Sequence, residues 1–269
     1  MPTARPAAVA GAFYPGEPQA LSAEVAAYLS QGSAGANVPA PKAIIAPHAG
    51  YMYSGPIAGT AYAGIAELGG RIRRVVLLGP AHREWVAGLA EPSVARFDSP
   101  LGAVPLDTEL LARLAKMPGV EVNDSAHALE HSLEVHLPFL QAALGKFELV
   151  PVLVGGAAAQ DVERLLLETW GGDETLIVVS SDLSHYLDYE AARRRDETTA
   201  QAIVALDARL DHHEACGATP INGLLRVARR RGLSARRLDL RNSGDTAGGR
   251  DRVVGYGAFA FHEPSRGNA

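Results

Sequence analysis

Residues 44–51 read IIAPHAGY, and residues 75–82 read VVLLGPAH. Each stretch is an aliphatic run that is followed within a few positions by a proline and a histidine. Continuous aliphatic runs of this length are typical of strands that are buried on both faces of a parallel sheet. Pro47 also restricts Ala46 to extended backbone. We therefore predict two buried strands that deliver His48 and His82 at their ends.

Similar runs recur along the chain and alternate with helical patterns. Strands are expected at about 42–47, 73–79, 147–153 and 174–180, and helices at about 56–68, 107–116, 133–144 and 159–170. Asp107 is a candidate N-cap. A further helix over about 220–231 would have Pro220 at its first position and would stop at Gly232. Strands joined by crossover helices indicate a parallel sheet.

The C-terminal part follows a different pattern. The extended runs ARRLDLRNS (235–243) and RVVGYGAFAF (252–261) are separated by a glycine-rich loop and predict an antiparallel pair added to the main sheet. No proline-rich or low-complexity linker divides the chain. The expected fold is α/β, one domain over residues 1–269 with a mixed, mostly parallel central sheet flanked by helices.

Composition narrows the function classes. The formal net charge is -5, which argues against a nucleic-acid or anionic-membrane binder, and the arginines of 226–237 fit a solvated helix face. One cysteine, Cys216, excludes an intrachain disulfide. The N-terminus lacks an apolar signal segment, and no run reaches the roughly 18 apolar residues of a membrane span. We expect a cytoplasmic protein.

Histidines follow three of the expected strands. Besides His48 and His82, the run TLIVVS leads to Asp182 and His185. Ligands of open α/β sheets bind beyond the carboxyl ends of the strands. Imidazole is the commonest side-chain metal ligand and also acts as a general acid or base. We expect a metal or catalytic site here, with Asp182 orienting His185.

Two further segments carry candidate residues. In LEHSLEVHLPFL (129–140), His131 and His136 are five apart, so this is no zinc-protease helix. We expect His131 and Glu134 to face the crevice and His136 to pack or cap. In RNSGDTAGG (241–249), Asp245 follows a strand; Asp is an ordinary turn residue, yet a carboxylate there can reach a metal. Two histidines and one carboxylate form the facial arrangement of non-haem Fe(II) oxygenases.

These motifs together resemble the Memo family, called component B of the AmmeMemoRadiSam system in prokaryotes. The resemblance rests on seven ordered segments: AGAFYPG (10–16), APHAGYMYSG (46–55), LLGPAHRE (77–84), EHSLEVHLPFL (130–140), SSDLSHY (180–186), CGATPI (216–221) and VVGYGAF (253–259).

The resemblance implies the fold of class III extradiol ring-cleaving dioxygenases. It implies that His48 and His82 hold the metal, that His185 and His131 are acid/base histidines, and that Asp245 lies at or near the third ligand position. That ligand is a glutamate in the dioxygenases and a cysteine in animal Memo proteins. The metal would be Fe(II), with Cu or Zn as alternatives. A radical SAM protein and an AMMECR-like protein are the implied partners.

Two function classes stay open. One is a metal-dependent, dioxygenase-like oxidoreductase acting on an unknown small molecule. The other is a non-catalytic binding or scaffold protein that uses the same pocket for a peptide or for a radical SAM pathway partner. A third interpretation makes Cys216 a nucleophile assisted by His212 or His213, although the neighbouring Gly217 and Pro220 favour a loop there.

Overall fold

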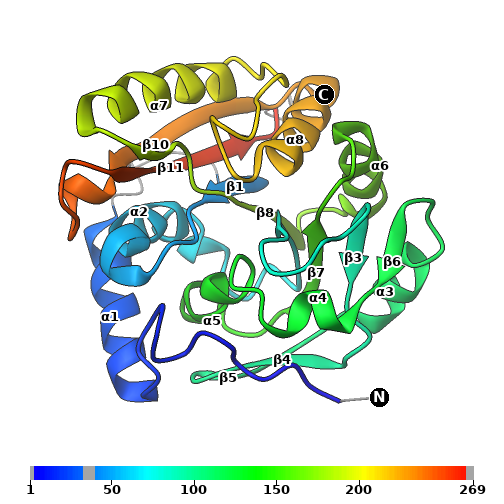
Figure 1. The fold of residues 1–269 in the computed structure, drawn as a ribbon. Coiled ribbons are helices and arrows are strands. Elements are labelled where there is room, and N and C mark those ends of the chain that lie inside the picture. The colour runs from blue at the N-terminus through cyan, green and yellow to red at the C-terminus, as the bar shows by residue number, and fades with distance from the viewer. Residues whose placement is uncertain (1–2, 33–39, 265–269) are drawn as a thin grey trace.

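A mixed sheet forms the centre of the computed structural model, which describes residues 3–32 and 40–264 (Figure 1). Its strand order is β10-β11-β1-β8-β2-β7-β3-β6, with β9 attached to β11. The parallel core consists of β1 (Ala43–Ala46), β8 (Thr175–Ser180), β2 (Arg74–Pro80) and β7 (Glu148–Val154). These strands are almost wholly buried. The four strands expected from the aliphatic runs are confirmed.

Antiparallel strands extend the sheet on both sides. β10 (Ser234–Asn242) pairs with β11 (Val253–His262), and β11 joins the core through β1, which confirms the expected C-terminal pair. On the other side, β3 (Leu89–Glu91) joins β7 and β6 (Val120–Val122) joins β3. β9 (His185–Leu187) pairs with β11, while β4 (Arg96–Ser99) and β5 (Gly102–Pro105) form a separate hairpin. Most of these added strands have three or four residues, which is too few for an alternation of apolar and polar residues to be recognised in the sequence.

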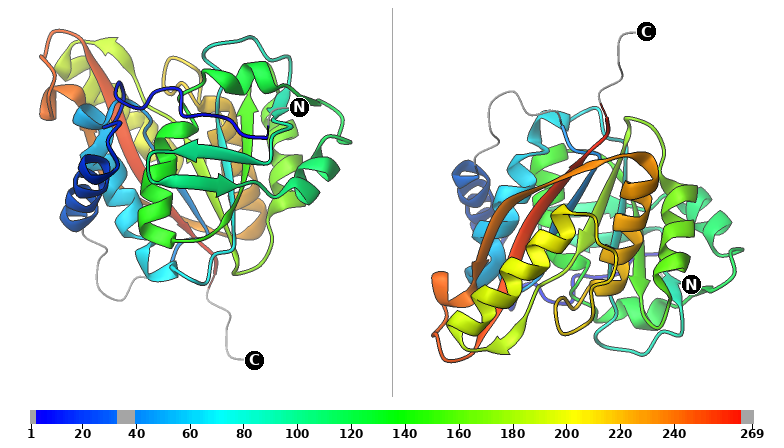
Figure 2. Two further views of the ribbon diagram at one scale, coloured as in Figure 1. Left: turned by 90° about the horizontal axis from the view of Figure 1, so that it is seen from below. Right: turned by 90° about the horizontal axis from the view of Figure 1, so that it is seen from above.

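Helices cover both faces of the sheet (Figure 2). One face carries α1 (Pro18–Gln31), α2 (Tyr51–Ala63) and α5 (Leu137–Leu144), and the other carries α6 (Ala159–Thr169), α7 (Tyr189–Val204) and α8 (Ala218–Arg231). The shorter helical segments are η1 (Ala66–Leu68), α3 (Thr108–Leu114), α4 (Asp124–Ala128), η2 (Glu134–His136) and η3 (Ser243–Asp245). Burial on both faces explains why the central strands are apolar throughout. None of the helices in the described part of the chain has the length and apolar character that crossing a membrane requires.

Helix ends agree only partly with the sequence. Asp107 caps α3 by accepting from the Leu110 amide at 2.9 Å, and Gly232 ends α8 with φ of +69°, both as predicted. Helix α2, however, begins at Tyr51, five residues before Pro56. Proline removes the amide that would bond to the Met52 carbonyl. Met52 is 58% exposed, so water can satisfy that carbonyl and the helix continues.

Candidate metal centre

The carboxyl ends of β1, β8 and β2 meet at one edge of the sheet because these strands are parallel and adjacent. The cavity at this edge has a volume of about 650 Å³. His48, His82, His131, Asp182 and His185 all line it. The expectation that three strand ends deliver histidines to one rim is therefore met by the geometry.

The tautomer of His48 follows from its hydrogen bonds. Its Nδ1 lies 2.6 Å from Ser180 Oγ, and that hydroxyl donates to the Ser132 carbonyl at 2.6 Å. Because the hydroxyl proton is already used, Ser180 Oγ accepts from His48 Nδ1–H. Nε2 is therefore the unprotonated ring nitrogen, and its neighbour is the Cys216 sulfur at 3.4 Å. Burial, followed by the charge of His82, also holds the pKa of His48 well below its usual range, so the ring is neutral.

His82 is oriented by a buried carboxylate. Its Nδ1 lies 3.1 Å from Glu130 Oε1, and its backbone amide donates to Glu130 Oε2 at 2.6 Å. A carboxylate of this kind accepts from Nδ1–H and directs the Nε2 lone pair outward, as is usual for a metal-binding histidine. In both His82 and His48, a hydrogen bond at Nδ1 therefore leaves Nε2 as the atom that can bind a metal.

The Glu130 carboxylate is held in its ionised form. Burial alone would raise its pKa, but hydrogen bonds from the His82 ring and from the Ser132 and His82 amides lower that pKa to about 2. The amides of Arg83 and His131 also donate to it, at 3.2 and 2.9 Å. The Glu130 carboxylate therefore connects, through hydrogen bonds, the loops that carry His82 and His131.

His131 completes the cluster. Its ring stacks on His82 with 4.9 Å between centroids and lies edge-on to His48 at 5.5 Å. Burial, offset in part by the charge of Glu130, lowers the pKa of His131 to about 4. One potential ligand atom from each of His48, His82 and His131 lies within 4.8 Å of the other two. Three imidazoles arranged in this way can hold a divalent metal.

The placement expected for Glu134 has to be corrected. Its carboxylate is fully buried away from the cavity, where Arg5 Nη1 donates at 2.5 Å and Tyr14 Oη at 2.6 Å. The amides of Ala8 and Val9 donate to it as well. Glu134 therefore anchors the N-terminal segment. Residues 130–133, directly before Glu134, are not helical.

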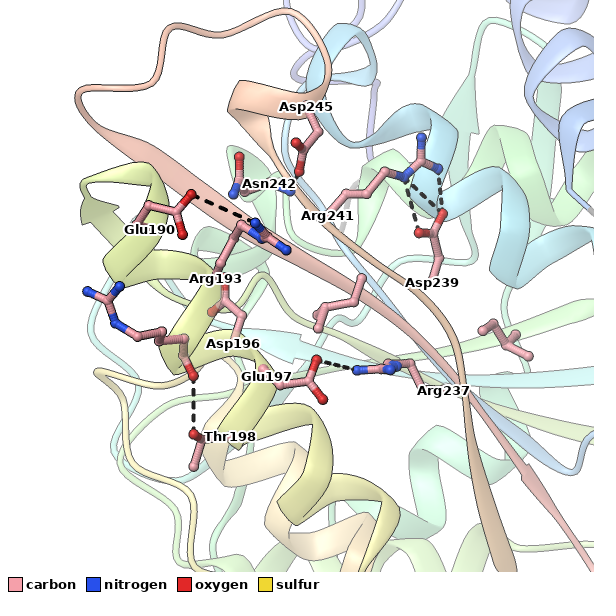
Figure 3. A pocket seen from close by; sticks show the side chains of 13 residues that line it. Glu190, Arg193, Asp196, Glu197, Thr198, Arg237, Asp239, Arg241, Asn242 and Asp245 are labelled. Atoms are coloured by element: carbon pink, nitrogen blue, oxygen red, sulfur yellow. Dashed lines mark hydrogen bonds and ion pairs between the residues drawn. The ribbon is translucent and has the colours of Figure 1, made fainter.

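Asp245 is also placed differently from expectation, because it lies outside the histidine cluster. Its Oδ1 accepts from Tyr189 Oη at 2.5 Å and its Oδ2 from the Asn242 amide at 2.9 Å. Figure 3 shows Asp245 above the cleft between α7 and β10, close to Asn242. The carboxylate closes its own turn, the ordinary role of aspartate in such loops. Among the described residues, His131 takes the place beside His48 and His82 that we expected for Asp245.

His136, His185 and Asp182 complete the set of expected residues. His136 is packed in the core with Nδ1 2.9 Å from Tyr62 Oη, in keeping with the packing role expected for it. His185 lines the cavity, and its Nδ1 contacts the Leu183 carbonyl at 2.8 Å. That carbonyl, rather than the expected Asp182, orients the ring, since the Asp182 carboxylate accepts from the His48 amide at 2.8 Å. Burial raises the pKa of Asp182 to about 6.

Cys216 lies beside the cluster, a position that the sequence did not reveal. Its Sγ is 3.4 Å from His48 Nε2 and accepts from the Asp182 amide at 3.3 Å. Burial, followed by the charge of Asp182, raises the pKa of the thiol to about 12. His212 contacts the Cys216 carbonyl and not its sulfur. The geometry therefore gives no support to activation of the thiol by His212, and it adds sulfur as a potential fourth donor next to His48.

The fold and site define a class: α/β proteins with a mixed central sheet and a histidine cluster at the carboxyl ends of its parallel strands. The family model described as "Memo-like protein" matches residues 5–260. A MEMO1 family protein of Aquifex aeolicus is 37% identical over 275 residues, covering 96% of this chain and 98% of the relative. One of Aeropyrum pernix is 39% identical, covering 80% and 82% of the two chains. The chain belongs to the Memo family.

Proposed function

We propose that His48, His82 and His131 bind one divalent metal ion and that the protein is a dioxygenase-like oxidoreductase using Fe(II). The observation that supports the metal site is the pair of hydrogen bonds to Ser180 and Glu130, because these bonds occupy Nδ1 of His48 and His82 and leave Nε2 of both rings as the ligand atom at the same edge of the cavity. Imidazole suits iron, zinc and copper alike. The resemblance to extradiol dioxygenases leads us to place Fe(II) first, with Zn and Cu as alternatives.

The neighbouring residues supply the remaining functions. When bound, the metal would act as a Lewis acid and redox centre for a substrate in the cavity. The Leu183 carbonyl accepts from His185 Nδ1–H, so Nε2 is the ring nitrogen that remains for proton transfer. Asp182 holds the His48 backbone in place and therefore positions the site. We propose His185 as the proton-transferring residue and His131 as a ligand, in place of its expected acid/base role.

Metal analysis of histidine variants tests this assignment. The wild type and the variants His48→Ala, His82→Ala, His131→Ala and His185→Ala would be purified without oxygen, loaded with Fe(II) and analysed for bound metal. The first three are expected to lose the metal, whereas His185→Ala keeps it. His213→Ala, an exposed histidine outside the cavity, is the matched control. Full metal content in the His48 and His82 variants would refute the site, and full content in the His131 variant would restore its acid/base role.

A non-catalytic binding protein is the second candidate. It is favoured by one observation: among the described residues, the cluster contains no carboxylate, in contrast to the facial arrangement of iron oxygenases. Oxygen uptake by the Fe(II)-loaded protein with a panel of aromatic diols separates the two. Absence of uptake, together with retention of a radical SAM or AMMECR-like protein by wild type and not by His82→Ala, would favour the binding function.

A further inference from the structure

The lining of the cavity beside the histidine cluster has more arginine than carboxylate side chains, although the chain as a whole carries a net charge of -5. Arg83 and Arg252 both line it, and they come from segments far apart in the sequence. Among the described residues that line the cavity, Asp182 is the only one with a carboxylate, and it is buried and accepts from the His48 amide.

Neither arginine has an acidic partner among the described residues. Arg252 lies over the Tyr186 ring at 5.0 Å, and Arg83 uses only its backbone amide, toward Glu130. The cleft between α7 and β10 is different: Arg237 is bound to Glu197 there and Arg241 to Asp239 (Figure 3). In that cleft, neighbouring carboxylates neutralise most of the arginine charge. In the histidine cavity, the guanidinium groups of Arg83 and Arg252 remain available to bind a ligand.

Aromatic side chains form much of the remaining wall. The Phe13 ring packs against His131 in a tilted arrangement with 4.7 Å between centroids, and Tyr53, Tyr186 and Tyr256 line the same space. Tyr186 is 63% exposed, so its ring is accessible to a ligand in the cavity. Flat rings present apolar area to a flat ligand and pack against its faces.

We propose that the cavity binds a small, flat organic anion, with Arg83 and Arg252 recognising its carboxylate or a similar anionic group. The aromatic walls contact the body of the ligand, and the anionic group lies between the guanidinium groups, which present donors in the planar arrangement that carboxylates match. The inference deepens the proposed function and rests on it only in assigning this cavity as the ligand site.

Three probes of nearly equal shape test the charge preference. Benzoate, benzamide and benzamidine carry charges of about -1, 0 and +1 on the same planar frame, so differences in binding report charge. Affinities would be measured by NMR titration on metal-free protein and on protein loaded with Zn. We expect benzoate to bind best in both forms. Arg83→Gln and Arg252→Gln are each expected to weaken benzoate binding by roughly fivefold, as for a partly exposed charge pair, and to leave benzamide binding unchanged.

The controls separate this inference from the metal proposal. Arg71→Gln removes the same charge from an exposed site near the opposite end of β2, and it should not change benzoate binding. Equal affinity for benzoate and benzamide in metal-free wild type would overturn the inference. So would a benzoate preference that survives in both arginine variants, because the metal or the histidines would then be the anion site. Failure of metal binding alone would leave the metal-free comparison intact.

Discussion

Glu130 is the residue whose substitution tests the site most sharply, because its carboxylate joins the loops of His82 and His131. In Glu130→Gln one oxygen becomes an NH₂ group. If that group replaces Oε2, it faces the backbone amides of His82 and Arg83, so hydrogen-bond donors point at one another. If it replaces Oε1, it faces the His82 ring nitrogen and the amides of His131 and Ser132. Either orientation leaves buried donors without an acceptor.

The loss of folding free energy expected for Glu130→Gln can be calculated from the shift in the pKa of Glu130. The pKa of Glu130 is about 2, against an ordinary value of 4.5. This difference corresponds to about 3 kcal/mol of folding free energy at neutral pH. Because the pKa is depressed in the fold, the contribution is complete above about pH 4.5 and is lost as the pH falls toward 2. Loss of two hydrogen bonds to a buried charged group gives a similar value of about 3 kcal/mol.

Two measurements check this prediction. Urea unfolding of metal-free Glu130→Gln at pH 7 should give a free energy of unfolding about 3 kcal/mol below wild type. Chelator competition should show metal affinity reduced roughly 10- to 100-fold, the usual effect of removing a carboxylate that orients a metal-binding histidine.

Glu134→Gln is the matched control for that experiment. Its carboxylate is equally buried, but it holds the N-terminal segment and has no contact with the cluster. We expect it to destabilise the protein to a similar extent and to leave metal affinity unchanged. Wild-type metal affinity in Glu130→Gln, or an equal loss in both variants, would refute the assignment of Glu130 as the residue that orients His82.

Three further predictions concern neighbouring residues. Asp196 is buried, accepts from the Ser184 amide at 3.0 Å and has a pKa raised by burial from 3.8 to about 6. This difference corresponds to about 3 kcal/mol, so Asp196→Asn should raise the free energy of unfolding at pH 7 by about that amount and give no gain below pH 4, as measured by urea unfolding at both pH values. Ser180→Ala removes the acceptor of His48 Nδ1, and chelator competition should show metal affinity roughly tenfold weaker; an unchanged affinity would contradict the tautomer argument. Gly255→Ala places a methyl group 2.0 Å from the Asp196 carboxylate, so thermal unfolding should show a loss of about 3 kcal/mol, and wild-type stability would refute the close contact.

The parallel core was predictable because burial on both faces leaves a direct trace in the sequence. The aliphatic runs ending near His48 and His82 became β1 and β2, and the extended C-terminal runs became the antiparallel pair β10 and β11. Helices α1 and α7 were not predicted. In α7 only five of the side chains are buried, and the arginine-rich stretch carries too few apolar residues for a clear helical period.

The sequence by itself determined which strands carry histidines, since a residue that directly follows a strand has little freedom of position. It could not determine which groups meet around them. Glu130, His131 and Cys216 lie in segments without regular structure at those positions, so spacing along the chain says nothing about where their side chains point. Hydrogen bonds between residues far apart in sequence decided that Glu130 orients His82, that Glu134 anchors Arg5 and that Asp245 closes a turn. Such contacts form only after the sheet has brought the strand ends together, and for that reason only the tertiary structure could assign them.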